Sequence, residues 1–527
     1  MRTRSRRRGG VDVPARQGQR FSRRTILRMG ASGALGAAAT AVLPGPTRAA
    51  SLRLPTAESA AVSSAQDADA RFRALDARIE AAMAEYQIPG VAVGAYYQGQ
   101  EYVRGYGVTN VDYPQPVDGD TLFRIGSITK TFTGTTAMRL VEQGLLNLDA
   151  PVRTYLPNLR LADESVAARV TLRQCLNHSA GWLGDYYPDF GRGADAIGRY
   201  VAAMVELPQL TPLGQVYAYN NASVVLAGHV VETVAGQPYE EVVRAQVVDP
   251  LGLDHTFFFS DELIGYNVAA SHDVQDGVPA VQPSWWRLWR ALNPTGGLIA
   301  SARDLLRYAR FHLGELEAAA GAPVLSTTAL RAMRTDLGPG GTSAYEIDGV
   351  GVNWFLRRTA EGVHVVEWVG TWPGQCASFF FVPERGCALT LLTNATSGAM
   401  LRTDLVYDDW ALEHFAGLHN PPAVPLALPA ARLAPYEGLY VARTISPPPG
   451  EAEESSFELR AADGRLRARM IAGDSTAETD FAFYRDNYVV ALYPDGRPSA
   501  WRGNFVPGPD GRIAWFSYGG ELYTRQG

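Results

Sequence analysis

Ser127 and Lys130 are the two side chains in this sequence best suited to covalent chemistry. Lys130 is the only lysine, and the other 47 of the 48 basic residues are arginine. Arginine cannot give up its proton in a protein, whereas a lysine whose pKa is lowered by burial can act as a base. The spacing of three residues places both side chains on one face of a helix. The pair predicts a serine nucleophile activated by lysine; the alternative is an N-capping serine followed by a solvated lysine.

A helix must position this pair, and we expect it over residues 127–143. Phe132, Met138 and Leu140 supply apolar positions along it, and Gly144 is a typical C-terminal stop. A serine at the N-terminus of such a helix lies at the positive end of the helix dipole, which favours developing negative charge.

Several segments in a consistent order resemble one family of serine hydrolases. They read Leu-Phe-Arg-Ile-Gly-Ser-Ile-Thr-Lys-Thr-Phe-Thr at 122–133, Leu-Asn-His-Ser-Ala-Gly at 176–181, Tyr-Ala-Tyr-Asn-Asn at 217–221, Leu-Ala-Gly-His at 226–229, Pro-Leu-Gly-Leu at 250–253 and Gly-Gly-Leu at 296–298. Together they resemble the β-lactamase and penicillin-binding-protein type, including class C β-lactamases, D,D-peptidases and family VIII carboxylesterases. The resemblance covers roughly residues 70–415.

The resemblance implies roles for residues beyond the first pair. Tyr219 would be the second proton-transfer residue, and Asn221 would hold the substrate amide or the lysine in place. Backbone N–H groups of Ser127 and Thr371 would form the oxyanion hole. Outside this motif context, Tyr219 would be interpreted as a buried aromatic and Asn221 as a helix N-cap.

The third family motif departs from its usual form at Trp368. β-Lactamases and D,D-peptidases carry Lys-Thr-Gly or His-x-Gly there, and this chain has Trp368-Val369-Gly370-Thr371. A cation at that position would help to anchor a substrate carboxylate, whereas indole offers a single N–H donor. Some family VIII esterases resemble this chain in carrying tryptophan. The change favours neutral esters or amides over carboxylate-bearing β-lactams, unless an arginine such as Arg357 or Arg402 replaces the missing cation.

These residues predict an exported serine hydrolase that cleaves a small-molecule ester or amide through a Ser127 acyl-enzyme, with carboxylesterase as the first candidate. A D,D-carboxypeptidase, D-aminopeptidase or β-lactamase remains an alternative, and a non-catalytic ligand-binding or penicillin-sensor protein is an alternative of another class. We expect no cofactor and no metal, because His178 and His229 do not lie in a metal-ligand spacing. Trp285, Trp286 and Trp289 could line an acyl pocket, belong to the core or clamp a loop.

Composition excludes several classes of protein. The three cysteines, Cys175, Cys376 and Cys387, are too few and too scattered for a disulfide framework, and we expect no disulfide. The formal charge of −6 combines a strongly basic first fifty residues, at +10, with a body at −16. Such an acidic body argues against nucleic acid and anionic membranes as partners.

Residues 1–50 have the organisation of a twin-arginine signal peptide. Arg23 and Arg24 follow a basic stretch and precede a short Ala/Gly-rich apolar run that ends in small residues. We expect a flexible linker at 51–69 and no membrane-spanning segment. The protein is therefore predicted to be exported to a periplasmic or extracellular location.

The remaining pattern predicts an α/β (α+β) fold with two domains. We expect a helix at 70–86, a hairpin at 91–97 and 101–106, strands at 363–368, 377–382 and 388–392, and a closing helix at 401–415. This order favours a β-lactamase/transpeptidase-like antiparallel sheet flanked by helices plus an all-helical region, over residues 70–418.

A Pro/Ala-rich linker at 419–435 separates this domain from residues 436–527. Asp463-Gly464, Asp495-Gly496 and Asp510-Gly511 are typical hairpin turns between short β-rich runs. We therefore expect a small, barrel-like all-β domain at the C-terminus.

Overall fold

The computed structural model describes residues 57–527, except 288, 317–323, 446–451 and 474. The predicted signal peptide and the first part of the predicted linker lie outside the described residues. The expectation of a flexible lead-in up to residue 69 is wrong from Ala57 onward, because helix α1 spans Ala57–Tyr86. Its first turns are rich in alanine, the strongest helix former. From Ala68 the helix is packed onto the domain core.

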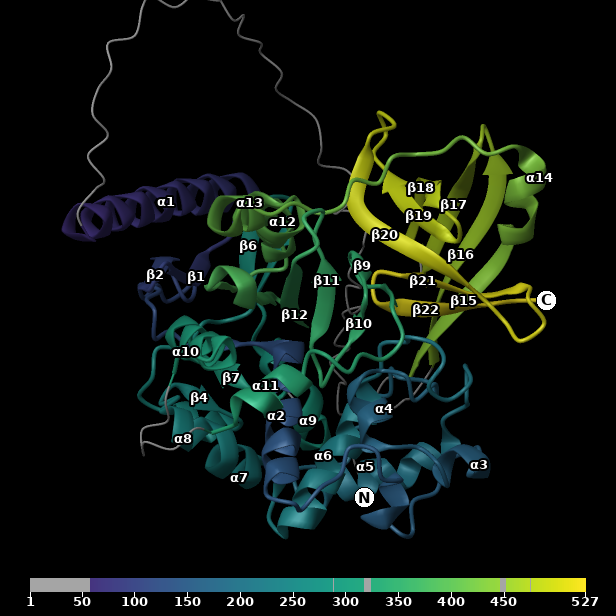
Figure 1. Cartoon of the computed structure of the whole chain (residues 1–527), viewed down its shortest axis with the longest axis horizontal. Coiled ribbons are helices and arrows are strands. Elements are labelled where there is room, and N and C mark those ends of the chain that lie inside the picture. Colours follow the sequence, from purple (N-terminus) through teal and green to yellow (C-terminus); the bar gives the residue numbers. More distant parts are fainter. Residues whose placement is uncertain (1–56, 288, 317–323, 446–451, 474) are drawn as a thin grey trace, which may run out of the picture.

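The first domain is built on a seven-stranded antiparallel sheet of order β10-β11-β12-β13-β14-β1-β2 (Figure 1). The strands are β1 (Gly90–Tyr97), β2 (Gln100–Gly107), β10 (Gly349–Val350), β11 (Phe355–Arg358), β12 (His364–Trp372), β13 (Gln375–Val382) and β14 (Cys387–Thr393). The chain ends of the domain thus meet in mid-sheet, where β14 pairs with β1 from Val91↔Thr393 to Tyr96↔Ala388. This confirms the expected antiparallel sheet with strands from both ends of the domain.

Both faces of this sheet are buried, so its central strands are almost wholly apolar. In β13 the side chains alternate: Phe379 and Phe381 belong to the core on one face, and Phe380 and Val382 to the core on the other. One face is covered by α10 (Ala302–Leu313) and α2 (Thr129–Glu142), the other by α1, α12 (Gly398–Arg402) and α13 (Trp410–Ala416) (Figure 1).

The expected closing helix at 401–415 is not continuous. After α12 the chain forms a π-helical turn, η10 (Thr403–Tyr407), and then breaks before α13. Asp409 has a φ of 66° at the break, a left-handed conformation that aspartate tolerates better than most residues. Its carboxylate accepts a hydrogen bond from the Asn420 N–H at 2.8 Å, which accounts for the break.

The all-helical region lies between β2 and β10 in sequence and packs beside the sheet. Its helices are α3 (Glu164–Ala167), α4 (Leu172–Leu176), α5 (Ala196–Ala203), α6 (Asn221–Ala235), α7 (Tyr239–Val243), α8 (Asp249–Leu251), α9 (Asn293–Gly296) and α11 (Thr327–Ala332). The helix α2 runs through the centre, in contact with α6, α7 and α9. Among the described helices, none combines the length and the apolar composition that crossing a bilayer requires.

The C-terminal domain is a closed eight-stranded barrel, which confirms the predicted barrel-like domain. Its strands are β15 (Gly438–Ile445), β16 (Ala452–Ala462), β17 (Arg465–Ala472), β18 (Ser475–Arg485), β19 (Tyr488–Leu492), β20 (Pro498–Pro507), β21 (Ile513–Tyr518) and β22 (Glu521–Arg525). The three Asp-Gly pairs lie in turns, and each glycine has a positive φ. The predicted linker at 419–435 holds one short helix, α14 (Ala430–Leu433).

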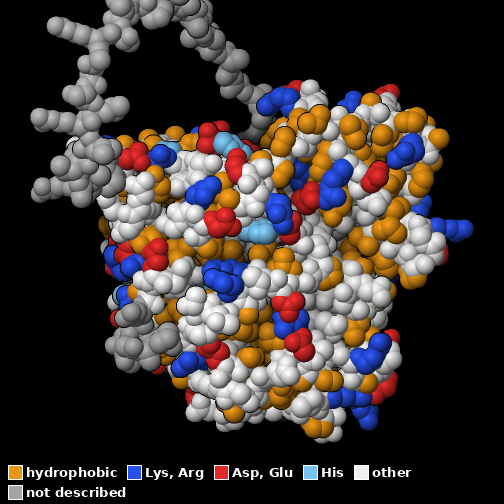
Figure 2. All heavy atoms as spheres, in the orientation of Figure 1, with side chains coloured by type: hydrophobic (Ala, Val, Ile, Leu, Met, Phe, Trp, Pro, Cys, Tyr) orange, Lys and Arg blue, Asp and Glu red, His pale blue; other side chains and the backbone are white. Residues whose placement is uncertain are grey.

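The barrel is attached to the first domain at the rim of the helical region. Ile445 at the end of β15 exchanges backbone hydrogen bonds of 2.8 Å with Asp185 and Tyr187. A second contact is the hydrogen bond of 2.8 Å from the Thr342 hydroxyl to the Asn504 side chain. Acidic and basic side chains are interspersed over the face drawn in Figure 2. The three cysteines are buried free thiols.

Candidate active site

Ser127 and Lys130 meet at the start of α2, as their spacing predicts. Ser127 lies in a 3₁₀ turn, η2 (Gly126–Ile128), and the α-helix begins at Thr129 rather than at the serine itself. The turn keeps the two side chains on one side, with Lys130 Nζ 3.0 Å from Ser127 Oγ. Ser127 is partly exposed, whereas Lys130 is fully buried. The amine therefore reaches the hydroxyl from inside the protein.

Burial favours the neutral, basic form of Lys130. Desolvation holds the pKa of its amine well below the ordinary range, and the charge of Asp185 acts weakly in the opposite direction. Besides Ser127, Nζ contacts the backbone oxygen of Thr295 in α9 at 2.8 Å. The backbone oxygen of Lys130 accepts a hydrogen bond from the Asn353 side chain at 2.8 Å, which anchors this turn of the helix. A neutral amine beside a hydroxyl can take its proton.

Tyr219 approaches the same pair from the segment that precedes α6. The Lys130 Nζ lies 4.9 Å from the centre of its ring, and His178 stacks on that ring at 4.8 Å. Burial raises the pKa of the Tyr219 phenol, while a hydrogen bond from Ser127 lowers it less strongly. The phenol is therefore protonated at neutral pH, so it is a proton donor in the resting site.

The neighbours of Asn221 give it a more indirect position than the sequence suggested. Its side-chain oxygen accepts a hydrogen bond from the Thr295 hydroxyl at 2.7 Å, and its amide donates to Asp185 at 2.9 Å and Tyr187 at 2.8 Å. No hydrogen bond joins it to Lys130 among the described residues. It holds Thr295, which in turn receives the lysine amine. The N-cap of α6 is its neighbour Asn220.

Two glycines bring the strand β12 against the nucleophile turn. A side chain at Gly370 would place its Cβ 1.9 Å from the Ile125 oxygen, and one at Gly126 would lie 3.0 Å from the Thr371 nitrogen. Gly126 also has a φ of 51°, which favours glycine. The backbone of Ser127 and that of Thr371 are therefore close neighbours, as two N–H groups around one oxyanion must be.

Trp368 lies at the position where the related enzymes have a cation, but its side chain is not exposed on the surface of the site. Its side chain is fully buried and stacks on Phe355 at 4.0 Å, with His178 at 5.6 Å and Tyr219 at 6.3 Å. The indole is thus a support behind His178 and Tyr219. This corrects the expectation that Trp368 itself contacts the substrate.

The two arginines that could supply a cation differ in the structure. Arg357 is buried and forms a two-pronged ion pair with Glu367 at 3.0 and 2.9 Å, so its charge is already matched. Arg402 in α12 donates to the Thr371 hydroxyl at 3.2 Å and reaches the Gly370 oxygen at 3.4 Å. Arg402 is therefore the arginine that borders the predicted oxyanion strand.

The tryptophan segment forms a clamp rather than an apolar pocket. The guanidinium of Arg124 lies between the rings of Trp286 and Trp372, 4.7 and 5.0 Å from their centres. Trp372 also donates to the Trp285 backbone oxygen, which ties this loop to the end of β12. Trp286 and Trp289 also pack against apolar core clusters, so the structure supports both the loop-clamp and the core interpretation.

Three residues of the site carried no clear signal in the sequence. His178 is fully buried, has a φ of 57° and accepts a hydrogen bond from Asn220 N–H at 2.8 Å. Burial holds the pKa of His178 well below the ordinary range, and a positive charge on Lys130 lowers it further whenever the amine is protonated. Asp185 and Thr295 are distant from Ser127 in the sequence, and only the tertiary fold places them at the site.

A cleft of about 200 Å³ opens beside Tyr219, and both domains line it. The first domain contributes Trp182 and Asp185, and the barrel contributes Arg443, Glu521 and Gln526. The barrel therefore forms one wall of the cleft beside Tyr219. Within the described part of the chain, no group of three or more His, Cys, Asp or Glu side chains is arranged to hold a metal ion.

Comparisons with known proteins agree with this geometry. The sequence profile of the family described as Beta-lactamase matches residues 75–411. Penicillin-binding protein 4 of Amycolatopsis lactamdurans is 32% identical over 364 residues, covering 68% of this chain and 95% of that protein. The crystal structure of SurE is 27% identical and covers 87% of this chain and 100% of its own, with a TM-score of 0.68. The structure of SurE with D-Leu is 26% identical to this chain and has a TM-score of 0.66, with the same coverage of both chains.

Proposed function

We propose that this chain, which belongs to the β-lactamase family of serine hydrolases, is a carboxylesterase that acts through a Ser127 acyl-enzyme. The observation that carries the proposal is the contact of 3.0 Å between Ser127 Oγ and the amine of Lys130, the buried lysine. A hydroxyl with a neutral amine at this distance is an activated nucleophile.

The first half of the proposed reaction acylates Ser127. Its oxygen attacks the ester carbonyl while Lys130 takes the hydroxyl proton, and the N–H groups of Ser127 and Thr371 hold the oxyanion. Tyr219 then donates its phenolic proton to the alkoxide as the carbon–oxygen bond breaks. The Lys130 ammonium returns a proton to Tyr219, so the alcohol leaves and both groups regain their resting forms.

The second half hydrolyses the acyl-enzyme. Water attacks the Ser127 ester and gives its proton to Lys130, directly or through Tyr219. The collapse of the second tetrahedral intermediate releases the carboxylic acid and returns that proton to Ser127 Oγ. His178 does not carry a proton in this scheme, because its imidazole is buried and uncharged behind Tyr219.

The preference for an ester rests on the third motif. Trp368 stands where a Lys or His would hold a substrate carboxylate, and it is buried behind Tyr219. A neutral ester needs no such anchor, whereas a penicillin or a peptide with a free C-terminus does.

A second candidate, cleavage of an amide beside a carboxylate, is favoured by Arg402. Its guanidinium lies 3.2 Å from the Thr371 hydroxyl, on the strand that would flank the scissile bond. It could therefore hold a carboxylate that Trp368 cannot. The similarity to SurE, one structure of which contains D-Leu, also supports an amino-acid-bearing substrate for this candidate.

A non-catalytic ligand-binding or sensor protein is the alternative of another class. The intact set of Ser127, Lys130 and Tyr219 argues against it, because a protein that only binds ligands does not need a neutral lysine 3.0 Å from a serine hydroxyl. We further propose that residues 1–50 direct export by the twin-arginine pathway. Replacing Arg23 and Arg24 with lysine should keep the precursor in the cytoplasm, and undiminished export of that variant would refute the proposal.

The first experiment is intact mass spectrometry after brief exposure to p-nitrophenyl butyrate, a fluorophosphonate and a penicillin, with Ser127→Ala as control. Ester turnover and a fluorophosphonate adduct that the substitution abolishes support the esterase. A stable penicillin adduct with negligible ester turnover supports a peptidase or sensor instead. The absence of every adduct would overturn Ser127 as the nucleophile.

Arg402→Gln separates the two enzyme candidates. If the substrate carries a carboxylate, this variant should lose at least tenfold in kcat/KM on a D-alanyl-D-alanine peptide with a free C-terminus, and less on the amidated peptide. If the protein is an esterase, we expect wild type and Arg402→Gln both to cleave the peptide slowly. Their rates of butyrate ester hydrolysis should then differ by less than threefold.

A further inference from the structure

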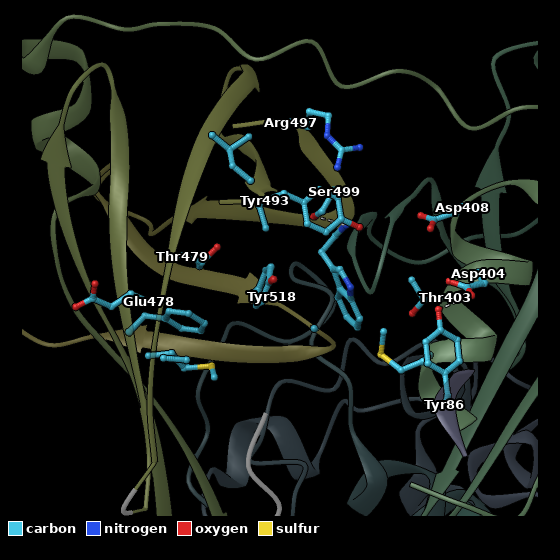
Figure 3. A pocket seen from close by; sticks show the side chains of 18 residues that line it. Tyr86, Thr403, Asp404, Asp408, Glu478, Thr479, Tyr493, Arg497, Ser499 and Tyr518 are labelled. Carbon is cyan, nitrogen blue, oxygen red and sulfur yellow. Dashed lines mark hydrogen bonds between the residues drawn. The ribbon is translucent and has the colours of Figure 1, made fainter. Parts of the chain in front are cut away.

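A second cavity, of about 340 Å³, lies at the end of the barrel that faces α12 and η10 (Figure 3). Strands β16 to β21 supply its wall on one side, and Tyr86 of α1, Met400 of α12 and Asp404 of η10 close the other side. It shares no lining residue with the cleft beside Tyr219. The proposed reaction therefore makes no use of it.

The cavity exists because small side chains leave the lumen unfilled at this end. An eight-stranded barrel is just wide enough either to be filled by its own side chains or to hold one small ligand. Phe505 and Phe516 stack at 4.6 Å, and Phe481 lies 5.5 Å from Phe516, so aromatic rings fill part of the lumen. Ala491 and Ser499 line the cavity. Its volume falls at the lower end of the range of small-molecule sites, about 300–1,000 Å³.

The barrel side of the cavity is suited to an apolar body. Phe457, Met470 and Trp501 line it, and Met470 is a flexible side chain that adapts to a ligand's shape. The Thr479 hydroxyl oxygen in the same wall is buried without a hydrogen-bond partner among the described residues. Apolar walls with a few polar groups are the usual composition of a ligand pocket.

The opposite side of the cavity is acidic. Figure 3 shows Asp404 and Asp408 together on the first-domain side, across from the barrel strands. Asp404 accepts the Tyr86 hydroxyl at 2.8 Å, whereas the carboxylate of Asp408 has no hydrogen bond or ion pair within the described chain. Arg78 reaches only the backbone oxygen of Asp404, at 3.4 Å. Burial raises the pKa of both carboxyls, and the charge of Arg78 lowers it less strongly.

The arginine on the barrel rim does not neutralise this side. Arg497 lines the cavity, but its guanidinium is paired with Asp495 at 2.7 Å on the same turn. The cavity thus combines an aromatic and aliphatic interior with one acidic edge. Aromatic rings and carboxylates are both favourable neighbours of an ammonium group.

We propose that this cavity binds a small amphiphilic amine, with its apolar body in the barrel lumen and its ammonium group at Asp404 and Asp408. The site lies outside the hydrolase machinery and gives the barrel a binding function of its own. It does not depend on the proposed esterase activity.

Binding is tested on full-length Ser127→Ala protein, so that hydrolysis plays no part, by calorimetric titration with octylamine, 1-octanol and octanoate at pH 7. We expect saturable binding of one octylammonium per chain, and affinities for 1-octanol and octanoate that are at least tenfold weaker. Equal affinity for octylammonium and either control, or no saturable binding of octylammonium, would overturn it.

Two variants locate the bound molecule. Ala491→Leu fills the lumen and should weaken octylammonium binding at least tenfold. Asp408→Asn, at the acidic edge of the cavity, should weaken octylammonium binding about fivefold and leave 1-octanol binding unchanged, as expected for a partly solvated charge pair. Asp510→Asn, on a turn outside the cavity, is the matched control and should have no effect. Undiminished binding to Asp408→Asn, with its fold verified by circular dichroism, would refute the assigned position of the ammonium group.

Discussion

Replacing Lys130 with methionine should abolish activity and make the protein more stable at neutral pH. An unfolded lysine has a pKa of about 10.4. In the folded protein the amine is fully buried and its pKa lies well below the ordinary range, so folding favours loss of its proton. Each pKa unit of that difference costs about 1.4 kcal/mol of stability at a pH below the folded pKa.

Methionine avoids this cost but loses part of the local bonding. The contact of Lys130 Nζ with the Thr295 oxygen disappears, which leaves a buried carbonyl without a partner at a cost of about 1–3 kcal/mol. The net expectation is a higher free energy of unfolding for Lys130→Met at pH 7, because the pKa of Lys130 lies well below its ordinary value and each unit of that difference costs about 1.4 kcal/mol. General-base catalysis is lost at the same time, and kcat/KM should fall by a factor of about 10²–10⁴.

The pH dependence distinguishes this explanation from better packing. The cost of burying Lys130 is greatest below its folded pKa, and it disappears as the pH rises to the unfolded value. Urea unfolding of wild type and Lys130→Met at pH 7, 8, 9 and 10 should therefore show the stability advantage of Lys130→Met falling as the pH rises, by up to about 1.4 kcal/mol per pH unit. Arg139→Met on the same helix is the control, since arginine does not titrate in this range. A stability difference independent of pH would show that Lys130 keeps its charge when folded.

Three further changes test the site. Tyr219→Phe should lower kcat/KM by about 10²–10⁴ for an ethyl ester and less for a p-nitrophenyl ester, whose leaving group needs no proton; equal losses would contradict the role as acid. Gly370→Ala should lower kcat by about 10²–10³, because its Cβ would lie 1.9 Å from the Ile125 oxygen and displace the oxyanion strand; full activity would contradict that geometry. Asp185→Asn should move the acid limb of the kcat/KM profile to lower pH, because the Asp185 charge raises the pKa of Lys130; an upward shift would refute the coupling.

Local sequence patterns were sufficient to predict features that depend only on residues close together in the chain. The separation of Ser127 and Lys130 by three residues places them together in a turn or a helix, so the sequence alone determined that they meet. Asp-Gly pairs favour tight hairpin turns by their own conformational preferences, and the alternation of large side chains in β13 follows from the pleat of a strand. The predictions of sheet, helical region and barrel rest on such patterns.

Local patterns did not define the surroundings of residues that a distant segment contacts. Trp368 was expected at the substrate because of its motif position, but packing on Phe355 turns it into the core. Asn221 was expected at the substrate or the lysine, and it acts on Lys130 through Thr295, a contact between segments 74 residues apart. The closing helix breaks at Asp409 because its carboxylate receives a backbone N–H from Asn420.

The sequence by itself determined which chemistry is available to this protein, since one lysine three residues after a serine is a covalent property of the chain. The tertiary structure decided the state of that chemistry. Only folding removes water from Lys130, brings Asp185 within range of its charge and lays Gly370 against the nucleophile turn. Only barrel closure leaves a lumen with an acidic edge. Desolvation and charge coupling depend on distances through space, which no spacing along the chain specifies.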